Sequence, residues 1–277
     1  MLFEVHMSRT GLSHRFTRAI AREPSRSVIN GLRADDRGAP SHEQFVLDHH
    51  AYVAALEQAG VTVDVYPALE DFPDSVFVED AALCFPEGAV ILRPGAPSRT
   101  GEAEVMHKVL LSYYEDIQRI GEDEGYVDGG DILVTEDAVL VGLSARTNQA
   151  GFDTLKQKIA RWGYEARAIN TPEGVLHFKT DCGLIGPNAV LATYRLSGSP
   201  CFAGMTVLEV PRGEEPAANA ICVNDTVLLS AGHPKTAMLL RNAGYNVAEI
   251  PTQQAALVDG GPSCMSLRFN PVAFNPG

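Results

Sequence analysis

One cysteine of this sequence stands where a chain can present a nucleophile. Cys264 follows residues 258–263 (VDGGPS), whose glycine pair and proline predict a constrained turn, and precedes an apolar-rich run that predicts a strand over residues 265–269. A stiff turn fixes the direction of a thiol, and a thiolate is a strong nucleophile. A buried, inert cysteine is the alternative, because free cysteine is among the most buried residue types. On this stretch alone the inert cysteine is favoured, so other residues must decide.

Polar side chains recur at the start of several hairpin-like segments. They are Glu79, Asp80, Asp128, Asp131, His177, Lys179, Thr180 and Asn219, with Cys264 before the last strand. If these segments surround one axis, their first residues converge on a single cavity that holds a thiol, an imidazole and several carboxylates. A buried carboxylate needs a partner, because an unpaired buried charge is costly. The pattern therefore predicts an acid-lined pocket for a cation.

Two basic segments have the opposite charge. Residues 93–99 (RPGAPSR) and 142–148 (GLSARTN) each follow the second strand of a predicted hairpin and contain Arg99 and Arg146. The guanidinium fork suits a carboxylate, although solvated surface arginines are the plainer alternative. Together with the acids, these arginines predict a zwitterionic ligand with a cationic far end, such as an arginine derivative.

Repeated elements must position these groups. Three segments predict a helix that ends at a glycine and is followed by a strand: residues 52–67, 155–169 and 237–251, with Gly60, Gly163 and Gly244 after the helix. A fourth helix is predicted over residues 102–118, where Val105, Val109, Leu110 and Ile117 recur at helical spacing.

Hairpins recur between these helices. They are predicted over residues 76–93, 126–142, 177–194 and 217–230, each with turn residues between two apolar runs. Their spacing of about 40 to 50 residues indicates a repeat architecture. Pairing residues 264–269 with residues 2–6 would complete a fifth unit. The chain would then form a closed ring of ββαβ units without a free sheet edge.

Composition limits the class of protein. The chain has 277 residues, 45% of them apolar, and a net charge of −13, which disfavours a nucleic-acid partner. No window is long and apolar enough to predict a membrane span, and the first residues lack the pattern of a secretory signal. The five cysteines are scattered and form no CxxC pair, which disfavours a disulfide framework or a structural zinc site. We therefore expect a cytoplasmic protein without a membrane partner.

Six segments of the sequence match one known family in order. FPDSVFVED, RPGAPSR, DGGDIL, GLSARTNQAG, LHFK and VDGGPSC resemble the dimethylarginine dimethylaminohydrolases, members of the guanidino-modifying (pentein) superfamily. The resemblance extends over residues 20–270. It implies an α/β fold, a five-bladed pseudo-symmetric α/β propeller of ββαβ repeats, as a single domain over residues 1–277. This agrees with the repeats above.

The resemblance also implies roles for individual residues. Cys264 matches the family's nucleophile, His177 its general acid and base, and Asp128 the carboxylate that completes the catalytic set. The implied substrate contacts are Leu32, Asp74, Glu79, Asp80, Arg99, Arg146 and the main chain of Val258. Leu32 belongs to residues 27–40, which occupy the place of the family's lid but are rich in Arg and Asp, so the side-chain preference of this lid stays open.

The implied activity is hydrolysis of Nω-methylated L-arginine to L-citrulline and methylamine or dimethylamine through a covalent thiouronium on cysteine. It needs no metal and no organic cofactor, and its partner is a small molecule. Arginine deimination and hydrolysis of citrulline or another ureido acid are alternatives on the same fold. A ribosome-binding propeller without catalysis is a remote alternative. The oligomeric state stays open, a homodimer included.

Overall fold

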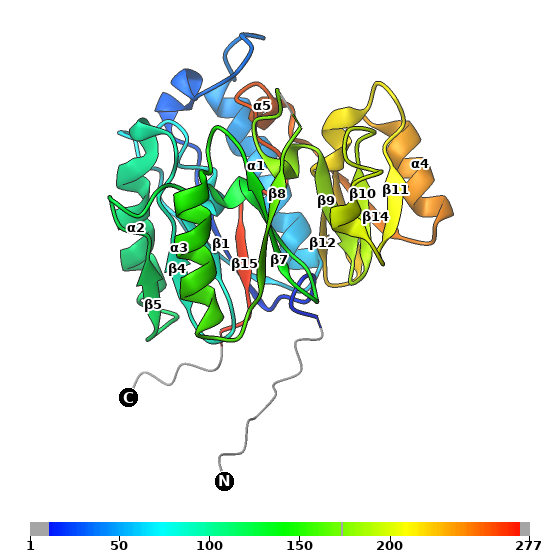
Figure 1. The fold of residues 1–277 in the computed structure, drawn as a ribbon. Helices are drawn as coiled ribbons and strands as arrows, with labels where there is room; N and C mark the ends of the chain where they lie inside the picture. The colour runs from blue at the N-terminus through cyan, green and yellow to red at the C-terminus, as the bar shows by residue number, and fades with distance from the viewer. Residues whose placement is uncertain (1–10, 173, 272–277) are drawn as a thin grey trace.

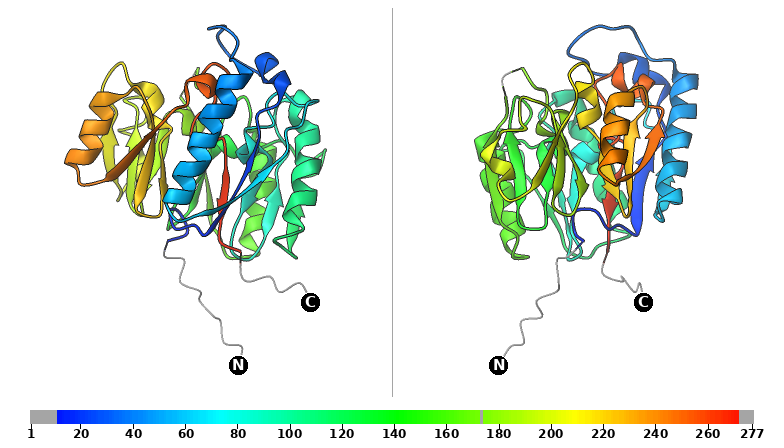
Figure 2. Two further views of the ribbon diagram at one scale, coloured as in Figure 1. Left: turned by 180° about the vertical axis from the view of Figure 1, so that it is seen from behind. Right: turned by 90° about the vertical axis from the view of Figure 1, so that its right-hand side faces the viewer.

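The structure, a computed structural model, describes residues 11–172 and 174–271. Its strands form five three-stranded sheets around a common axis (Figures 1 and 2). In each sheet the middle strand is antiparallel to one neighbour and parallel to the other. The sheets are β15–β1–β2 (Leu267–Phe269, Arg18–Arg22, Thr62–Tyr66), β3–β4–β5 (Ala82–Cys84, Ala89–Ile91, Ile117–Arg119), β6–β7–β8 (Ile132–Val134, Val139–Leu143, Ala166–Asn170), β9–β10–β11 (Cys182–Gly186, Ala189–Ala192, Thr206–Glu209) and β12–β13–β14 (Ile221–Val223, Thr226–Ser230, Asn246–Ile250).

Helices make the parallel connections, because a parallel pair needs a crossover. They are α1 (His42–Gln58), α2 (Thr100–Leu110), α3 (Gln149–Ala160) and α4 (Pro234–Asn242), and a short α5 (Gln253–Ala256) follows β14. The predicted propeller of ββαβ units is confirmed, with one departure. Between β10 and β11, where every residue is described, the chain forms the 3-10 turn η6 (Pro200–Phe202) in place of an α-helix. Within the described residues, no helix is long and apolar enough to cross a membrane.

The predicted helix ends are right in three cases and wrong in one. Gly60, Gly163 and Gly244 follow α1, α3 and α4 with φ of 92°, 78° and 91°, a conformation that is unstrained only for glycine. The helix predicted over residues 102–118 ends at Leu110 instead, and β5 takes its last residues. The rings of Tyr113 and Tyr114 pack 5.3 and 5.7 Å from that of Phe269. This tertiary packing, which helical spacing does not reveal, turns the chain after Leu110.

The ring closes through the two ends of the described chain. Strand β15 pairs with β1, so the first blade combines residues from both ends of the sequence (Figure 1). The closing partner is therefore β1, whereas we predicted residues 2–6, which lie outside the described residues. Ala19, Ile20 and Ala21 of β1 are fully buried. An apolar run this short between arginines is a weak sequence signal.

The apolar core lies between each sheet, its helix and the neighbouring sheet. One cluster joins Phe45, Tyr52 and Leu56 of α1 to Leu228 of β13 and to Met265, next to the predicted nucleophile. The Tyr52 hydroxyl donates a hydrogen bond to the carbonyl of Pro262 at 2.8 Å. Packing across the first and last units therefore supports the turn that leads to Cys264.

Short 3-10 turns before the strands bring polar residues to the axis. These turns are η2 (Val78–Ala81), η4 (Gly129–Asp131), η5 (Phe178–Thr180) and η7 (Glu215–Ala218), and successive turns contact one another. We predict these polar groups at the openings of the first hairpin strands; they lie instead in these turns or directly beside them. A Cβ on Gly129 would lie 1.9 Å from the Glu79 carbonyl oxygen, so only glycine permits this approach of η4 to η2.

The loop after η1 (Arg26–Asn30), residues 31–41, arches over one end of the molecule (Figure 2). The Ala34 N–H donates a hydrogen bond to the Asp259 carboxylate. Arg37 donates to the Ala256 carbonyl at 2.6 Å and to Asp259 Oδ1 at 3.3 Å. Asp259 has a φ of 56°, which asparagine, aspartate and glycine tolerate best. Asp259 thus fastens this loop to the turn that leads to Cys264.

We expect Asp259→Gly to loosen residues 31–41, because the carboxylate acceptor is lost while the left-handed backbone is still allowed. The lost bonds, worth about 1–2 kcal/mol, correspond to a roughly 5- to 30-fold larger open population. Limited trypsin digestion measures this population as the rate of cleavage after Arg33 and Arg37. Asp259→Asn keeps an oxygen acceptor and should cleave nearly as slowly as the unaltered protein. Equal rates for Asp259→Gly and the unaltered protein would show that Asp259 does not hold the loop.

Candidate active site

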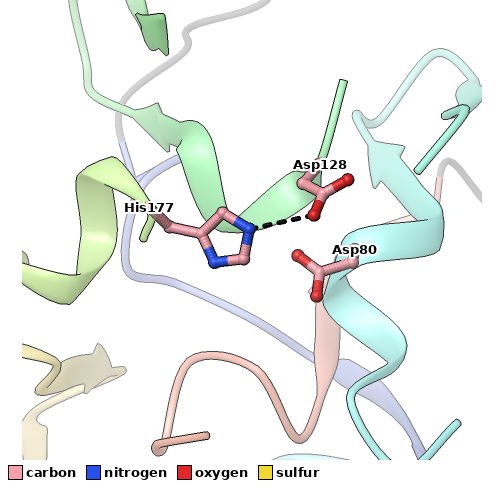
Figure 3. A group of neighbouring side chains, drawn as sticks. All are labelled: Asp80, Asp128 and His177. Carbon is pink, nitrogen blue, oxygen red and sulfur yellow. Dashed lines mark hydrogen bonds and ion pairs between the residues drawn. The ribbon is translucent and has the colours of Figure 1, made fainter. Parts of the chain in front are cut away.

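A buried histidine–aspartate pair lies where η4 and η5 meet. His177 Nε2 is 2.9 Å from Asp128 Oδ2 (Figure 3), and Asp128 Oδ1 accepts a hydrogen bond from the Gly95 N–H at 2.6 Å. Burial favours the neutral imidazole. The hydrogen bond to Asp128 and the charges of Asp80 and Asp131 outweigh it and raise the pKa of His177 to about 9. At neutral pH His177 is therefore a protonated acid, oriented by Asp128.

A second carboxylate faces the same imidazole (Figure 3). Asp80 Oδ1 accepts a hydrogen bond from the Gly130 N–H at 2.8 Å, and Oδ2 forms an ion pair with Arg99. Burial favours the protonated acid, but Arg99, His177 and the Gly130 N–H outweigh it and lower the pKa of Asp80. Asp80 is therefore an anion next to the His177 cation.

Gly130 makes this approach sterically feasible. A Cβ at this position would lie 2.8 Å from His177 Nδ1 and 3.1 Å from Asp80 Oδ1. Any side chain would push the imidazole or the carboxylate out of place. The second glycine of the DGGD motif is thus required by the close packing of Asp80 and His177 around it.

Cys264 ends a turn that is packed on both sides. A Cβ on Gly260 would lie 2.2 Å from the Phe77 ring, and the Ser263 N–H donates to Asn219 Oδ1 at 3.0 Å. The predicted constrained turn is confirmed. Burial, followed by the charges of Glu79 and Asp80, raises the pKa of Cys264 to about 11. The group is therefore a thiol at neutral pH when no cation lies beside it.

One cavity of about 140 Å³ brings most of the predicted residues together. Its lining includes Leu32, Asp74, Asp80, Arg99, Arg146, His177, Val258 and Cys264. Side chains from several blades and from the loop of residues 31–41 therefore meet at one place. A single cavity of this kind is what the sequence predicts. Asp128 lies behind His177, outside the lining, and acts on the cavity through the imidazole.

The structure does not bring the Glu79 side chain to this cavity. Glu79 Oε1 is 2.6 Å from Lys179 Nζ and 2.9 Å from Arg268 Nη2, and these three residues line a separate cavity of about 110 Å³. The Glu79 N–H donates to the Cys264 carbonyl at 3.2 Å, and Arg268 donates to the Ser263 carbonyl at 3.1 Å. Glu79 therefore supports the nucleophile turn from behind. From this position the Glu79 side chain does not reach the cavity of about 140 Å³, so the structure gives no support for its predicted contact with substrate.

The two predicted carboxylate-binding arginines differ in their surroundings. Arg99 is buried, and its guanidinium is bonded to Asp80, to Glu102 and to two backbone carbonyls. Arg146 is half-buried, and its guanidinium has no hydrogen bond or ion pair to any described residue. Arg146 is therefore free to bind a carboxylate, whereas Arg99 mainly holds Asp80 in place. A direct contact of Arg99 with substrate stays a prediction.

Sequence reasoning assigned no role to several residues that build the site. Glu102, in the first turn of α2, binds Arg99, the residue just before that helix, at 2.7 Å, and their spacing of three residues was the available signal. Asp131 accepts hydrogen bonds from Ser144 at 2.6 Å and Thr147 at 2.7 Å, which ties η4 to the Arg146 loop. Asn219 was noted only as the start of a hairpin. No local pattern indicates the contact of Asn219 with Ser263, because the two are distant in sequence.

The same side chains could be considered for a metal ion. Asp80, Asp128 and His177 each offer a donor atom within 4.8 Å of the others (Figure 3). A metal would have to displace the proton of His177, whose pKa is raised, and compete with Arg99 for Asp80. Two carboxylates beside a protonated imidazole suit an organic cation that donates hydrogen bonds better than they suit a metal.

Comparisons with known proteins agree with this geometry. The family model described as "N,N dimethylarginine dimethylhydrolase, eukaryotic" matches residues 20–193. The N(G),N(G)-dimethylarginine dimethylaminohydrolase of Pseudomonas aeruginosa is 39% identical and aligns with 92% of this chain and all of the relative. The enzyme of that name from Streptomyces coelicolor is 33% identical, with 91% and 96% of the two chains aligned.

Solved structures give the same result. A cysteine-to-serine mutant of the Pseudomonas aeruginosa enzyme in complex with citrulline superposes with a TM-score of 0.89 at 38% identity, over 92% of this chain and all of that one. The N-terminal domain of ArgZ, a cyanobacterial arginine dihydrolase, superposes with a TM-score of 0.82 over 93% and 99% of the two chains, but its 20% identity shows only a shared fold. This chain belongs to the dimethylarginine dimethylaminohydrolase family.

Proposed function

We propose that this protein hydrolyses Nω-methylated L-arginine to L-citrulline and methylamine or dimethylamine. The main support is one arrangement: Cys264, a protonated His177 and ionised Asp80 line a cavity that also contains Arg146, whose guanidinium has no hydrogen bond or ion pair within residues 11–172 and 174–271. The cavity thus offers anions at one part and a cation at another, which complements an amino acid with a guanidinium end. The name of the 39% identical relative supports the same substrate.

Substrate binding follows from the charges. Asp80 accepts N–H groups of the guanidinium, while Asp128 acts behind it by holding His177, and Arg146 binds the α-carboxylate as a planar fork. Asp74 lines the same cavity, and its Oδ1 accepts a hydrogen bond from the Leu32 N–H at 2.9 Å. Burial raises the pKa of Asp74, while Arg99 and Arg146 oppose that rise. Residues 31–41 therefore close over the amino-acid end of the ligand.

The guanidinium also activates the thiol. The pKa of Cys264 is near 11 because of burial and nearby negative charge, so a cation bound beside it favours loss of the thiol proton to solvent. The thiolate attacks the guanidinium carbon and forms a C–S bond. His177 then donates its proton to the methylated nitrogen, the C–N bond breaks, and the amine leaves a thiouronium on Cys264.

Hydrolysis reverses the proton transfer. His177, now neutral, takes a proton from water as the water oxygen bonds to the thiouronium carbon. The C–S bond then breaks as the remaining hydroxyl proton passes to solvent and the C=O bond forms, which releases citrulline and restores the thiolate and the protonated imidazole. Asp128 keeps the imidazole oriented in both steps, because its other oxygen is fixed by the Gly95 N–H. Each step is thus assigned to a group in the cavity or directly behind it.

Citrulline formation from monomethylarginine, dimethylarginine and arginine tests the function. We expect kcat/KM for the methylated substrates to exceed that for arginine, and Cys264→Ser to lower turnover at least about 10³-fold, because a hydroxyl is far harder to ionise. Circular dichroism checks that the variant is folded. Equal or better kcat/KM for arginine would make the protein a deiminase, and citrulline formation by Cys264→Ser would remove Cys264 as the nucleophile.

Arg146→Ala should raise KM for monomethylarginine about 10- to 100-fold with a smaller change in kcat, because a charge-assisted hydrogen-bond pair of about 1.5–3 kcal/mol is lost. The matched comparison is the decarboxylated analogue of monomethylarginine, which lacks the α-carboxylate. This analogue should be a poor substrate of the unaltered protein, and Arg146→Ala should not raise its KM further. A similar loss for both substrates would mean that Arg146 does not bind the carboxylate.

The titration of Cys264 should respond to Asp80. A thiolate is destabilised by a neighbouring anion, so Asp80→Asn should move the thiolate midpoint below the value of about 11, and Arg99, then balanced by Glu102 alone, adds to this decrease. Thiolate ultraviolet absorbance measures the midpoint, with Cys264→Ser subtracted to remove the other cysteines. A midpoint that stays the same or rises would show that Asp80 does not control the thiol.

A further inference from the structure

A second and larger cavity, of about 540 Å³, borders the same catalytic pair. Cys264 and His177 line both cavities, whereas Asp80 and Arg146 line only the smaller one. From the thiol, the larger cavity extends past Asn219 toward Thr252 of the last blade. Two spaces therefore meet at the reacting atoms, and the mechanism above uses only one of them.

Charge decides how a substituted guanidinium lies at this junction. Asp80 and Asp128 lie on one side of the His177 imidazole (Figure 3). Nitrogens that carry N–H groups gain most from these carboxylates, while an alkylated nitrogen has fewer donors to offer. The alkylated nitrogen therefore turns away from the two acids while staying within reach of His177, its proton donor. The larger cavity lies beside His177 and, unlike the smaller one, is not lined by Asp80; the carboxylates in its lining are Asp35, Asp181, Glu215 and Asp259.

Volume supports the same orientation. The smaller cavity, of about 140 Å³, has to hold the amino-acid part of the substrate and leaves little room for a long substituent. The larger cavity falls within the range of about 300–1,000 Å³ that is typical of small-molecule sites. Part of its wall is apolar: Val175, Leu176, Ala231 and Ala256 contribute to it.

We propose that the larger cavity receives the substituent on the leaving nitrogen, so that the substrates include L-arginines with Nω-alkyl groups longer than methyl. This inference rests on the proposed function and extends its substrate class. The same bonds change: sulfur bonds to the guanidinium carbon, the C–N bond breaks, and His177 protonates the departing alkylamine. Each methylene added to the alkyl substituent lies in a cavity that already exists, so longer alkyl groups can bind without a rearrangement of the protein.

A series of Nω-methyl-, ethyl-, propyl- and butyl-L-arginine tests the inference through kcat/KM for citrulline and alkylamine release. We expect all four values within about threefold of one another or rising with length, since a buried methylene gains up to about 0.8 kcal/mol. A fall of about tenfold per methylene would overturn the inference while leaving the methyl substrate and the proposed function intact. Absence of turnover with the methyl substrate would instead overturn the proposed function.

A variant that fills the larger cavity shows whether long alkyl groups are accepted because they occupy this cavity or for some other reason. Ala256 lines only the larger cavity and is half-buried at the end of α5; its bond from Arg37 goes to the main-chain carbonyl, which a side-chain substitution keeps. Ala256→Phe should lower kcat/KM for the butyl substrate at least about tenfold while changing the methyl substrate less than about twofold, because overpacking penalises only the long substituent. Ala203→Phe, at an exposed position that lines neither cavity, is the matched control.

A second filling variant keeps the test decisive if Ala256→Phe folds poorly. Ala231, the residue directly after β13, also lines the larger cavity, and Ala231→Phe fills it from a different element than α5. Thermal melting identifies which variant is folded. A butyl-to-methyl ratio that is unchanged in a folded filling variant would show that the substituent does not occupy this cavity.

Discussion

Compensation of buried negative charge at the propeller axis is the constraint on which this structure depends. Asp80, Asp128 and Asp131 are almost fully buried, and each needs cations or N–H donors to avoid a large desolvation penalty. Backbone N–H groups supply those donors: Gly130 of η4 for Asp80, Phe178 of η5 for Asp131, and Gly95 of the loop after β4 for Asp128. Backbone N–H groups of one blade thus satisfy carboxylates of another, which fixes the blades relative to one another and holds the site rigid.

The distribution of cations around these acids explains the chemistry. Arg99 neutralises Asp80 and Glu102, and Lys179 with Arg268 neutralises Glu79 behind the nucleophile turn. What remains is a protonated His177, a thiol that is hard to ionise alone, and an Arg146 guanidinium that no described residue pairs with. A cationic, carboxylate-bearing ligand therefore adds the charges that the site lacks. The family to which the chain belongs acts on ligands of that kind, as the names of its members state.

Rigidity and mobility are divided between two parts of the site. The catalytic groups lie on turns that pack against other blades, as the close approach of Gly129 to Glu79 shows. Residues 31–41, by contrast, are held by a few hydrogen bonds to Asp74, Asp259 and Ala256. A loop with few buried contacts opens at a small free-energy cost. The larger cavity at the Cys264–His177 junction adds space on the other side of the reacting atoms.

The sequence alone determined the repeat, the class of fold and most of the site. Turn chemistry, helix-ending glycines and short apolar runs on either side of turn residues are local signals, so the hairpins and three of the helix ends were predictable. The motifs DGGD and VDGGPSC also indicated which side chains would converge. Only the tertiary structure decided the end of α2, the closing partner of β15 and the different positions of Arg99 and Glu79. Those depend on contacts between residues distant in the chain, such as Tyr113 with Phe269 and Glu79 with Arg268, whose packing and pairing energies leave no pattern in the local sequence.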